Sequence, residues 1–272
     1  MALDLSLSVK QNGNNTVDLL AEASGISKVK IKQSMTAGAV WITRRNKTKR
    51  LRRAKADITQ GDVISIYYDE TVLGTVPEPP TLISDEGIYS IWYKPAGLLS
   101  SGSKYGDHCA INRWVEMNKQ PQKPVFIVHR LDRFATGIML LAHTKHAAAA
   151  LSKQFKDRQV SKIYQVIVDG VLDENQSISE SLDGKDALSF ISVLEKNEPL
   201  MQSLIEVDIK TGRKHQIRRH LAHIGFPVVG DRQYGNATSG ELILTAYKLS
   251  FLHPKTKEKM TYELEEALRP KF

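Results

Sequence analysis

The nonapeptide HRLDRFATG, residues 129–137, is the stretch that decides the fold of this 272-residue chain. An apolar run precedes it at residues 125–128, and a longer one follows it at residues 138–142. Both runs have the length and the branched side chains of buried strands. The polar residues between them are therefore expected where two strands leave the core, so that Asp132 is presented rather than buried.

Two other segments accompany this stretch. KPAGL precedes it at residues 94–98, and TGRKHQIRRH follows it at residues 211–220. A helix is expected from about residue 213, because its apolar residues recur on one face and Arg218 borders that face. Gly225 ends this helix, and a proline two residues later prevents its continuation.

Composition indicates a polyanionic partner. The formal net charge is +8 and the isoelectric point is near 9.4, which favours nucleic acid without indicating a fold. The single cysteine, Cys109, excludes an internal disulfide and fits a reducing, cytoplasmic location. No signal peptide and no apolar window of membrane-spanning length is present, so neither export nor membrane insertion is expected.

The strongest compositional signal lies between residues 28 and 55, where eleven Lys or Arg residues occur without one Asp or Glu. Cations in such a block repel each other unless a polyanion neutralises them, and Lys and Arg contacts to phosphates release counterions. One helix is predicted from a capping Thr16 to Gly25, and a second from a capping Ser27 to Gly38. Short strands are predicted at residues 39–43 and 63–68, with a basic loop between them. We therefore expect an RNA-binding module at residues 1–69, a Pro-rich linker at 70–82 and a catalytic domain at 83–272.

The predicted catalytic domain is rich in strands and has a few intervening helices. Strands are expected at residues 162–169, 189–194, 202–210 and 242–252, and a helix at 145–158. This order predicts an α+β protein with a mixed, largely antiparallel sheet and flanking helices, preceded by a small α/β module.

Taken in this order, the three motifs resemble the RluA-type family of RNA pseudouridine synthases. Residues 14–69 resemble an S-four-type RNA-binding domain, which is named for a ribosomal protein. The family resemblance implies that Asp132 is the catalytic nucleophile and that Arg218 keeps it ionised. It also implies that Tyr164 is the active-site tyrosine, which stacks on the base and is a candidate proton acceptor.

The resemblance and the basic composition together indicate a set of RNA-binding residues. Arg130 matches a residue that fills the gap left by a flipped-out nucleotide, and His129 contacts the backbone or supports the loop. The expected substrate-binding residues are His129, Arg130, Arg213, Lys214 and Arg219 near the site, and Arg44, Arg45, Arg50 and Arg52 in the basic block. The chain departs from the family at Ala135, where Thr is typical, and at Tyr93, where the family often has Asn before the Lys-Pro pair. Because of the second departure, only a structural role is expected for Lys94.

The implied reaction is the isomerisation of uridine to pseudouridine in structured RNA, without metal or organic cofactor. Ribosomal RNA is the first expectation and transfer RNA the alternative, with no required protein partner and a monomeric state. The sequence leaves open which uridine is modified, whether one or several sites react, and whether Asp132 attacks base or sugar.

Other function classes fit less well. A metal hydrolase would need His215, His220 and His223, of which only the last two share a helix face. A glycoside hydrolase would need a second carboxylate beside Asp132, and the glycine signatures of nucleotide-binding enzymes are missing. The remaining rival is a non-catalytic RNA-binding or ribosome-assembly protein, which would not require Asp132, Tyr164 and Arg218 together.

Overall fold

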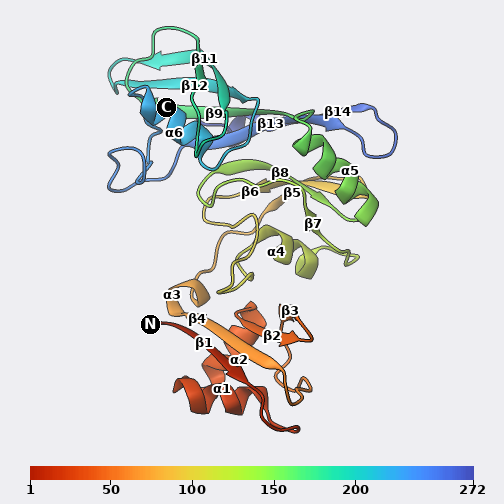
Figure 1. Cartoon of the computed structure of the whole chain (residues 1–272). Helices are drawn as coiled ribbons and strands as arrows, with labels where there is room; N and C mark the ends of the chain where they lie inside the picture. The colour runs from red at the N-terminus through yellow and green to blue at the C-terminus, as the bar shows by residue number, and fades with distance from the viewer. The chain divides into compact units, whose positions relative to one another are not determined.

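The computed structural model describes all 272 residues and divides the chain into two compact units (Figure 1). The first unit comprises residues 1–77 and 101–117, and the second comprises residues 78–100 and 118–272. The boundary after Pro77 falls within the expected linker. Both ends of that linker are structured, because Asp69 caps the short helix α3 (Glu70–Leu73) and strand β5 (Thr81–Asp85) begins the second unit.

The first unit is a four-stranded antiparallel sheet with helices. The strand order is β1-β4-β2-β3. Its elements are β1 (Ala2–Ser8), α1 (Thr16–Ser24), α2 (Lys28–Ala37), β2 (Val40–Arg44), β3 (Lys47–Arg50) and β4 (Val63–Asp69). Leu20, Ile31, Met35 and Ile66 are fully buried where the helices meet the sheet. Burial of these side chains stabilises the unit by roughly 2 kcal/mol each.

The two predicted helices of this unit are confirmed, with their caps. The Ser27 hydroxyl accepts from the Lys30 N–H at the start of α2, and Gly38 ends α2 in the left-handed conformation. The cap of α1 differs from the prediction: Asn15, not Thr16, accepts from the first free N–H groups. Strands β1 and β3 were not predicted, and β3 lies within the block that was expected to be a loop.

Residues 101–117 were expected in the catalytic domain, but they cluster with the first unit. Asp107 accepts ion pairs from Arg50 and Arg52, and the Trp41 indole donates to the Lys104 carbonyl. Sequence gives no sign of these pairings, because 55 to 63 residues separate the partners. Helix α4 (Ile111–Asn118) begins in this segment.

The second unit contains one mixed sheet of ten strands. The order along the sheet is β10-β11-β12-β9-β13-β8-β6-β5, with β14 paired to β13 and β7 paired to β8. The strands not yet located are β6 (Tyr89–Lys94), β7 (Phe126–Ile127), β8 (Thr136–Ala142), β9 (Ser161–Asp169), β10 (Gln176–Ser179), β11 (Leu188–Asn197), β12 (Gln202–Ile209), β13 (Leu244–Leu252) and β14 (Lys259–Glu263). Only β13 and β8 run parallel, which confirms the predicted α+β, largely antiparallel class.

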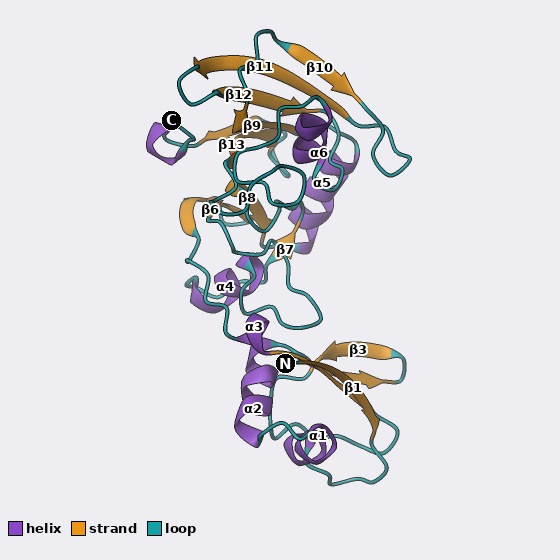
Figure 2. Ribbon diagram, turned by 90° about the vertical axis from the view of Figure 1, so that its left-hand side faces the viewer, coloured by secondary structure: helices purple, strands orange, loops and turns teal.

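Helices lie beside this sheet (Figure 2). Helix α5 (Lys145–Lys156) packs against β7 and β8, and α6 (Gln216–His223) follows β12; a 3₁₀ turn at Glu266–Leu268 lies near the C-terminus. Ile217 and Leu221 are buried on α6, as its apolar spacing predicted. No helix of the chain combines the length and apolar character that crossing a membrane requires.

The parallel junction between β8 and β13 positions the signature stretch. Gly137 pairs with Ala246 across this junction, and Ala246 pairs with Tyr164 on its other side. A Cβ on Gly137 would lie 2.3 Å from the Ala246 carbonyl oxygen, and the φ of Gly137 is +116°. Glycine therefore allows the close approach that places β8, which follows the Asp132 loop, on one side of β13, opposite the side where β9 carries Tyr164.

Candidate active site

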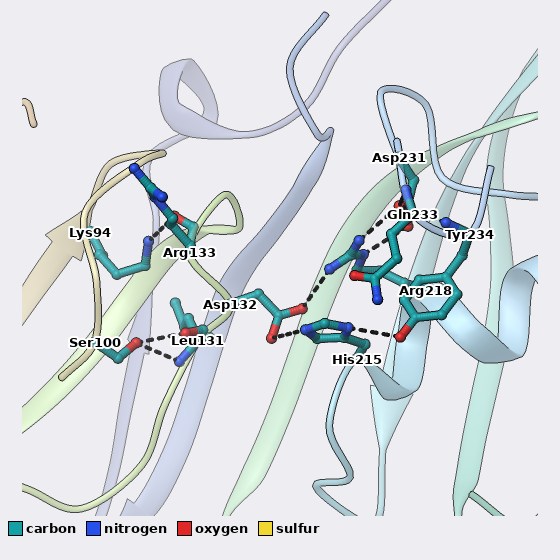
Figure 3. Close-up of polar contacts among 10 residues, drawn as sticks. All are labelled: Lys94, Ser100, Leu131, Asp132, Arg133, His215, Arg218, Asp231, Gln233 and Tyr234. Atoms are coloured by element: carbon teal, nitrogen blue, oxygen red, sulfur yellow. Dashed lines mark hydrogen bonds and ion pairs between the residues drawn. The ribbon is translucent and has the colours of Figure 1, made fainter. Parts of the chain in front are cut away.

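The backbone around Asp132 is fixed by two buried side chains (Figure 3). The Lys94 ammonium donates to the carbonyls of Pro95, Leu98 and Arg133 at 2.9, 2.9 and 3.1 Å. The Ser100 hydroxyl donates to the Leu131 carbonyl and accepts from its N–H. Burial lowers the pKa of Lys94 to about 7, although the charge of Asp132 opposes this shift. Lys94 thus has the structural role that was expected.

Residues 211–216 form the turn that brings α6 to Asp132. The Gln216 amide oxygen accepts from the Thr211 hydroxyl and the Arg213 N–H, and its nitrogen donates to the Leu188 carbonyl and to the Ser189 hydroxyl. One buried amide therefore ties the turn to β11. The turn ends at His215, whose φ is +53° and which precedes the first residue of α6.

Arg218 connects two carboxylates. Its Nε and Nη2 each donate to Asp231 at 2.7 Å, and its Nη1 lies 3.5 Å from Asp132 Oδ2. Burial alone would raise the pKa of Asp231, but hydrogen bonds from Arg218 and from the Gln233 and Tyr234 N–H groups outweigh it, so that this pKa is lowered. The Arg218 guanidinium is thus held in place, with its third nitrogen directed at Asp132.

His215 is the second neighbour of Asp132. Its Nε2 lies 3.9 Å from Asp132 Oδ1, and its Nδ1 lies 2.9 Å from the Tyr234 hydroxyl (Figure 3). Burial lowers the pKa of His215, with Arg218 and Lys214 acting in the same direction, while Asp132 and Asp231 oppose it. The Tyr234 ring also lies 5.0 Å from the Arg218 guanidinium. Tyr234 therefore contacts both groups that flank Asp132.

Tyr164 lies on β9, where its side chain is buried. Burial, and then the charge of Asp132, raise the pKa of the Tyr164 phenol. The phenol is therefore neutral at physiological pH, and it offers a ring face and one hydroxyl to a bound base.

His129 supports the loop. Its Nε2 accepts from the Leu140 N–H at 2.9 Å, and its ring stacks on Phe155 with the ring centres 4.7 Å apart. Burial lowers the pKa of His129 to about 3, so the imidazole is neutral. These contacts correspond to the supporting role that was the second of its two expected roles.

Asp132, Tyr164 and Arg218 line one cavity of about 590 Å³, a size that suits a small ligand or one nucleotide. Asp132 is the only carboxylate in its lining. The cationic lining residues are Arg130, Lys156, Arg158, Lys162, Lys210, Arg213 and Arg218. The positive charge of the lining would attract an anionic substrate to the one carboxylate that could act as a nucleophile.

The expected substrate-binding residues near the site occupy different places. Arg130 and Arg213 line the cavity, and Arg130 is exposed. Lys214 is exposed outside the lining, and Arg219 forms a two-pronged ion pair with Asp183. The structure therefore brings together Asp132, Arg130 and Arg213, but not Lys214 or Arg219.

The basic block is partly neutralised within the chain, although the segment itself contains no acidic residue. Arg44 pairs with the buried Asp62, and Arg50 and Arg52 both pair with Asp107. Arg45 is exposed in the turn between β2 and β3 and has no acidic partner. The acids lie outside residues 28–55, so counting charges within that segment missed them.

Sequence reasoning also missed Asp231, Tyr234, Lys156 and Arg158, and it weighed His215 only as a metal ligand. The one available signal for Asp231 is a carboxylate that follows an apolar run at residues 226–229 after a single glycine, Gly230. The nitrogens of His220 already contact the Ser189 hydroxyl and the Glu180 carbonyl. No group of three His, Cys, Asp or Glu side chains in the chain could hold a metal ion.

Comparisons with known proteins identify relatives of this chain. Residues 88–223 match the family model described as RNA pseudouridylate synthase. An uncharacterized RNA pseudouridine synthase of Aquifex aeolicus is 30% identical, over 88% of this chain and 86% of that protein. Ribosomal large subunit pseudouridine synthase D of Neisseria meningitidis is 30% identical, over 74% of this chain and 62% of its own length.

A further curated relative carries a different substrate name. tRNA pseudouridine synthase C of Haemophilus ducreyi is 32% identical, over 62% of this chain and 83% of that protein. Among solved structures, human RNA pseudouridylate synthase domain containing 1 is 21% identical, with a TM-score of 0.60 over 72% of this chain and 88% of that chain. This last similarity shows the fold alone.

Proposed function

The chain belongs to the RNA pseudouridylate synthase family and is an RNA pseudouridine synthase; we propose that Asp132 is its nucleophile and large-subunit ribosomal RNA its substrate. The observation that carries the first proposal is the placement of one carboxylate in a cationic cavity, beside a neutral imidazole and a fixed guanidinium. Isomerisation requires the bond from base to sugar to break, the base to rotate, and a new carbon bond to form. A carboxylate can form the covalent intermediate that divides this reaction into two steps.

The other two residues have distinct roles in this proposal. Arg218 Nη1 lies 3.5 Å from Asp132 Oδ2, and its positive charge holds the carboxylate in place for attack. The Tyr164 ring stacks on the uracil. Because its hydroxyl is protonated, it can accept a proton from the base only while it donates its own proton to another acceptor. Arg130, which is exposed at the rim, fills the gap left by the flipped nucleotide.

The choice of ribosomal RNA rests on the first unit and on the relatives. The sheet and helices of that unit support an S-four-type RNA-binding module at the N-terminus, which suits a large, folded substrate. Relatives named for large-subunit ribosomal RNA and for transfer RNA both match this chain. Transfer RNA is therefore the second candidate.

The test is a pseudouridine map at single-nucleotide resolution, made on ribosomal and transfer RNA from cells with and without this gene. We expect the loss of one or a few large-subunit sites, restored by the wild type and not by Asp132→Asn. Lost sites in transfer RNA alone would overturn the proposed substrate. Product formation by purified Asp132→Asn protein would overturn the nucleophile.

A further inference from the structure

Arg158 has an unusual backbone conformation at the end of α5. The Gln159 N–H donates to the Gln154 carbonyl at 2.9 Å, and the Arg158 N–H donates to the Phe155 carbonyl at 3.3 Å. These two hydrogen bonds form a Schellman motif, which ends a helix with one residue in the left-handed conformation, and that residue is usually glycine. Here that residue is Arg158, with φ of +58°. A strained non-glycine residue at such a position is a reason to look for a function.

The Arg158 side chain lines the active-site cavity together with Lys156. Four other cations of the lining already contact groups within the chain: Arg218 contacts Asp231, Lys210 contacts Asp208, Arg213 contacts the Asp186 carbonyl and Lys162 contacts the Thr211 carbonyl. Arg158 and Lys156 are both exposed, and neither is ion-paired. Their charges are therefore available to a ligand in the cavity.

We propose that Arg158 and Lys156 form a phosphate-binding subsite, which holds a backbone phosphodiester of the RNA next to the flipped uridine. This inference rests on the proposed function, because the phosphate belongs to the RNA whose uridine reaches Asp132. The guanidinium fork matches two phosphate oxygens, and the lysine adds a point charge beside it. Both side chains line the cavity and are exposed, which places the two cations at its mouth.

Replacing Arg158 by glycine separates this role from a structural one. Glycine adopts the left-handed conformation without strain, so Arg158→Gly should melt no lower than the wild type. The matched control is Lys257→Gly. Lys257 has φ of +66°, is exposed between β13 and β14 and does not line the cavity, so that change relieves the same strain and removes the same charge.

Binding is measured in the Asp132→Asn background, where turnover does not interfere. The probes are a transcript of large-subunit ribosomal RNA and a single-stranded oligouridylate, titrated over a range of salt concentrations. Arg158→Gly should weaken binding about sixfold at 0.1 M salt and lower the slope of log Kd against log salt by about 0.7 to 0.9, which corresponds to one phosphate contact. Lys257→Gly should change neither quantity, and Arg158→Lys should restore most of the slope.

Equal slopes for Arg158→Gly and Lys257→Gly would overturn the subsite, and so would a lower melting temperature of Arg158→Gly than of the wild type. The proposed function fails separately, in the map of modified sites. A changed slope in a protein that forms no pseudouridine would leave the subsite standing without that function. Pseudouridine formation with an unchanged slope would remove the subsite alone.

Discussion

Arg218 and Asp231 form a two-pronged ion pair whose two nitrogen–oxygen distances are both 2.7 Å, and the Asp231 side chain has no exposed surface. The same guanidinium approaches Asp132 only to 3.5 Å. Because the buried carboxylate takes the shorter contacts, Asp132 is oriented by the guanidinium without being tightly bound to it. An under-coordinated carboxylate is a better nucleophile than one engaged in a short, two-pronged pair.

The first prediction concerns Asp231→Asn. Loss of the buried charge leaves Arg218 without its anchor, so we expect the unfolding free energy to fall by about 3 kcal/mol and turnover to fall by about 100-fold. Urea unfolding and single-turnover assays measure these effects. Asp183→Asn is the control, because it breaks the exposed pair with Arg219 and should change stability by less than about 1 kcal/mol. Wild-type turnover in Asp231→Asn would contradict the anchoring role.

The second prediction follows from the lowered pKa of Asp231. Because the folded state holds this carboxylate ionised below its ordinary range, its contribution to stability is complete above the unfolded pKa near 4 and is lost as the pH falls through the folded pKa. The stability difference between the wild type and Asp231→Asn should therefore be constant from about pH 5 to 7 and shrink below pH 4. Urea midpoints across this range measure it, and a difference that grows on acidification would refute the assignment.

The third prediction concerns Tyr234→Phe. Because His215 Nε2 faces the Asp132 carboxylate, we assign the proton of the neutral imidazole to Nε2, so that Nδ1 accepts from the Tyr234 hydroxyl. The change to Phe removes this hydrogen bond and keeps the ring beside Arg218. We expect kcat to fall about tenfold, or about 1.4 kcal/mol, with little change in KM. Without this donor the pKa of His215 should rise, so the acid limb of the pH–rate profile should move to higher pH.

Tyr262→Phe is the matched control for that change, because Tyr262 bonds to Tyr89 and Glu86 and does not line the cavity. It should leave kcat and the pH profile as in the wild type. If Tyr234→Phe and Tyr262→Phe behave alike, Tyr234 has no positioning role.

Local signals in the sequence predicted most of the fold. Apolar spacing and capping residues located α1, α2 and α6, and branched apolar runs located β8, β9, β12 and β13. The edge strands β1 and β3 were not predicted, because they are polar on their exposed faces. Each becomes a strand only by pairing with a neighbour, β1 with β4 and β3 with β2. The placement of residues 101–117 with the first unit involves contacts of Asp107 and Lys104, whose partners are distant in sequence.

The candidate site shows the same division. Asp132, Tyr164 and Arg218 could be named because motifs carry them, and all three line the cavity. Asp231 and Tyr234 belong to no motif that was recognised, and their roles arise only when the segment after α6 folds back onto Arg218. Ion pairs across long loops of this kind leave no periodic or compositional trace.

The fourth prediction concerns the junction of β8 and β13. Gly137→Ala places a methyl group 2.3 Å from the Ala246 carbonyl oxygen, so the strands must separate beside Asp132. We expect loss of activity and a fall in unfolding free energy of several kcal/mol, on the order of an overpacked core. Gly184→Ala is the control, since Gly184 also has a positive φ but open space around it, and it should lose only about 1 kcal/mol. Similar losses of unfolding free energy in both variants would mean that the effect comes from backbone strain at a positive φ and not from the close approach of the strands.

The last prediction separates two kinds of cation in the first unit. Arg50 and Arg52 are bound to Asp107, whereas Lys47 and Lys49 on β3 are exposed and have no acidic partner. Replacing Lys47 and Lys49 together by Gln should lower the salt slope of RNA binding by about 1.5, the effect of two phosphate contacts, and leave stability unchanged.

The matched double change, Arg50→Gln with Arg52→Gln, removes the same charge but leaves the Asp107 carboxylate partly buried and unpaired. We expect it to lower the unfolding free energy by about 3 kcal/mol and to leave the salt slope nearly unchanged. Both double variants remove two positive charges. An effect of net charge alone would therefore give them equal salt slopes of RNA binding. The reverse result would be a lower salt slope in the double arginine variant and an unchanged slope in the double lysine variant. It would show that the RNA takes the place of Asp107 beside the two arginines.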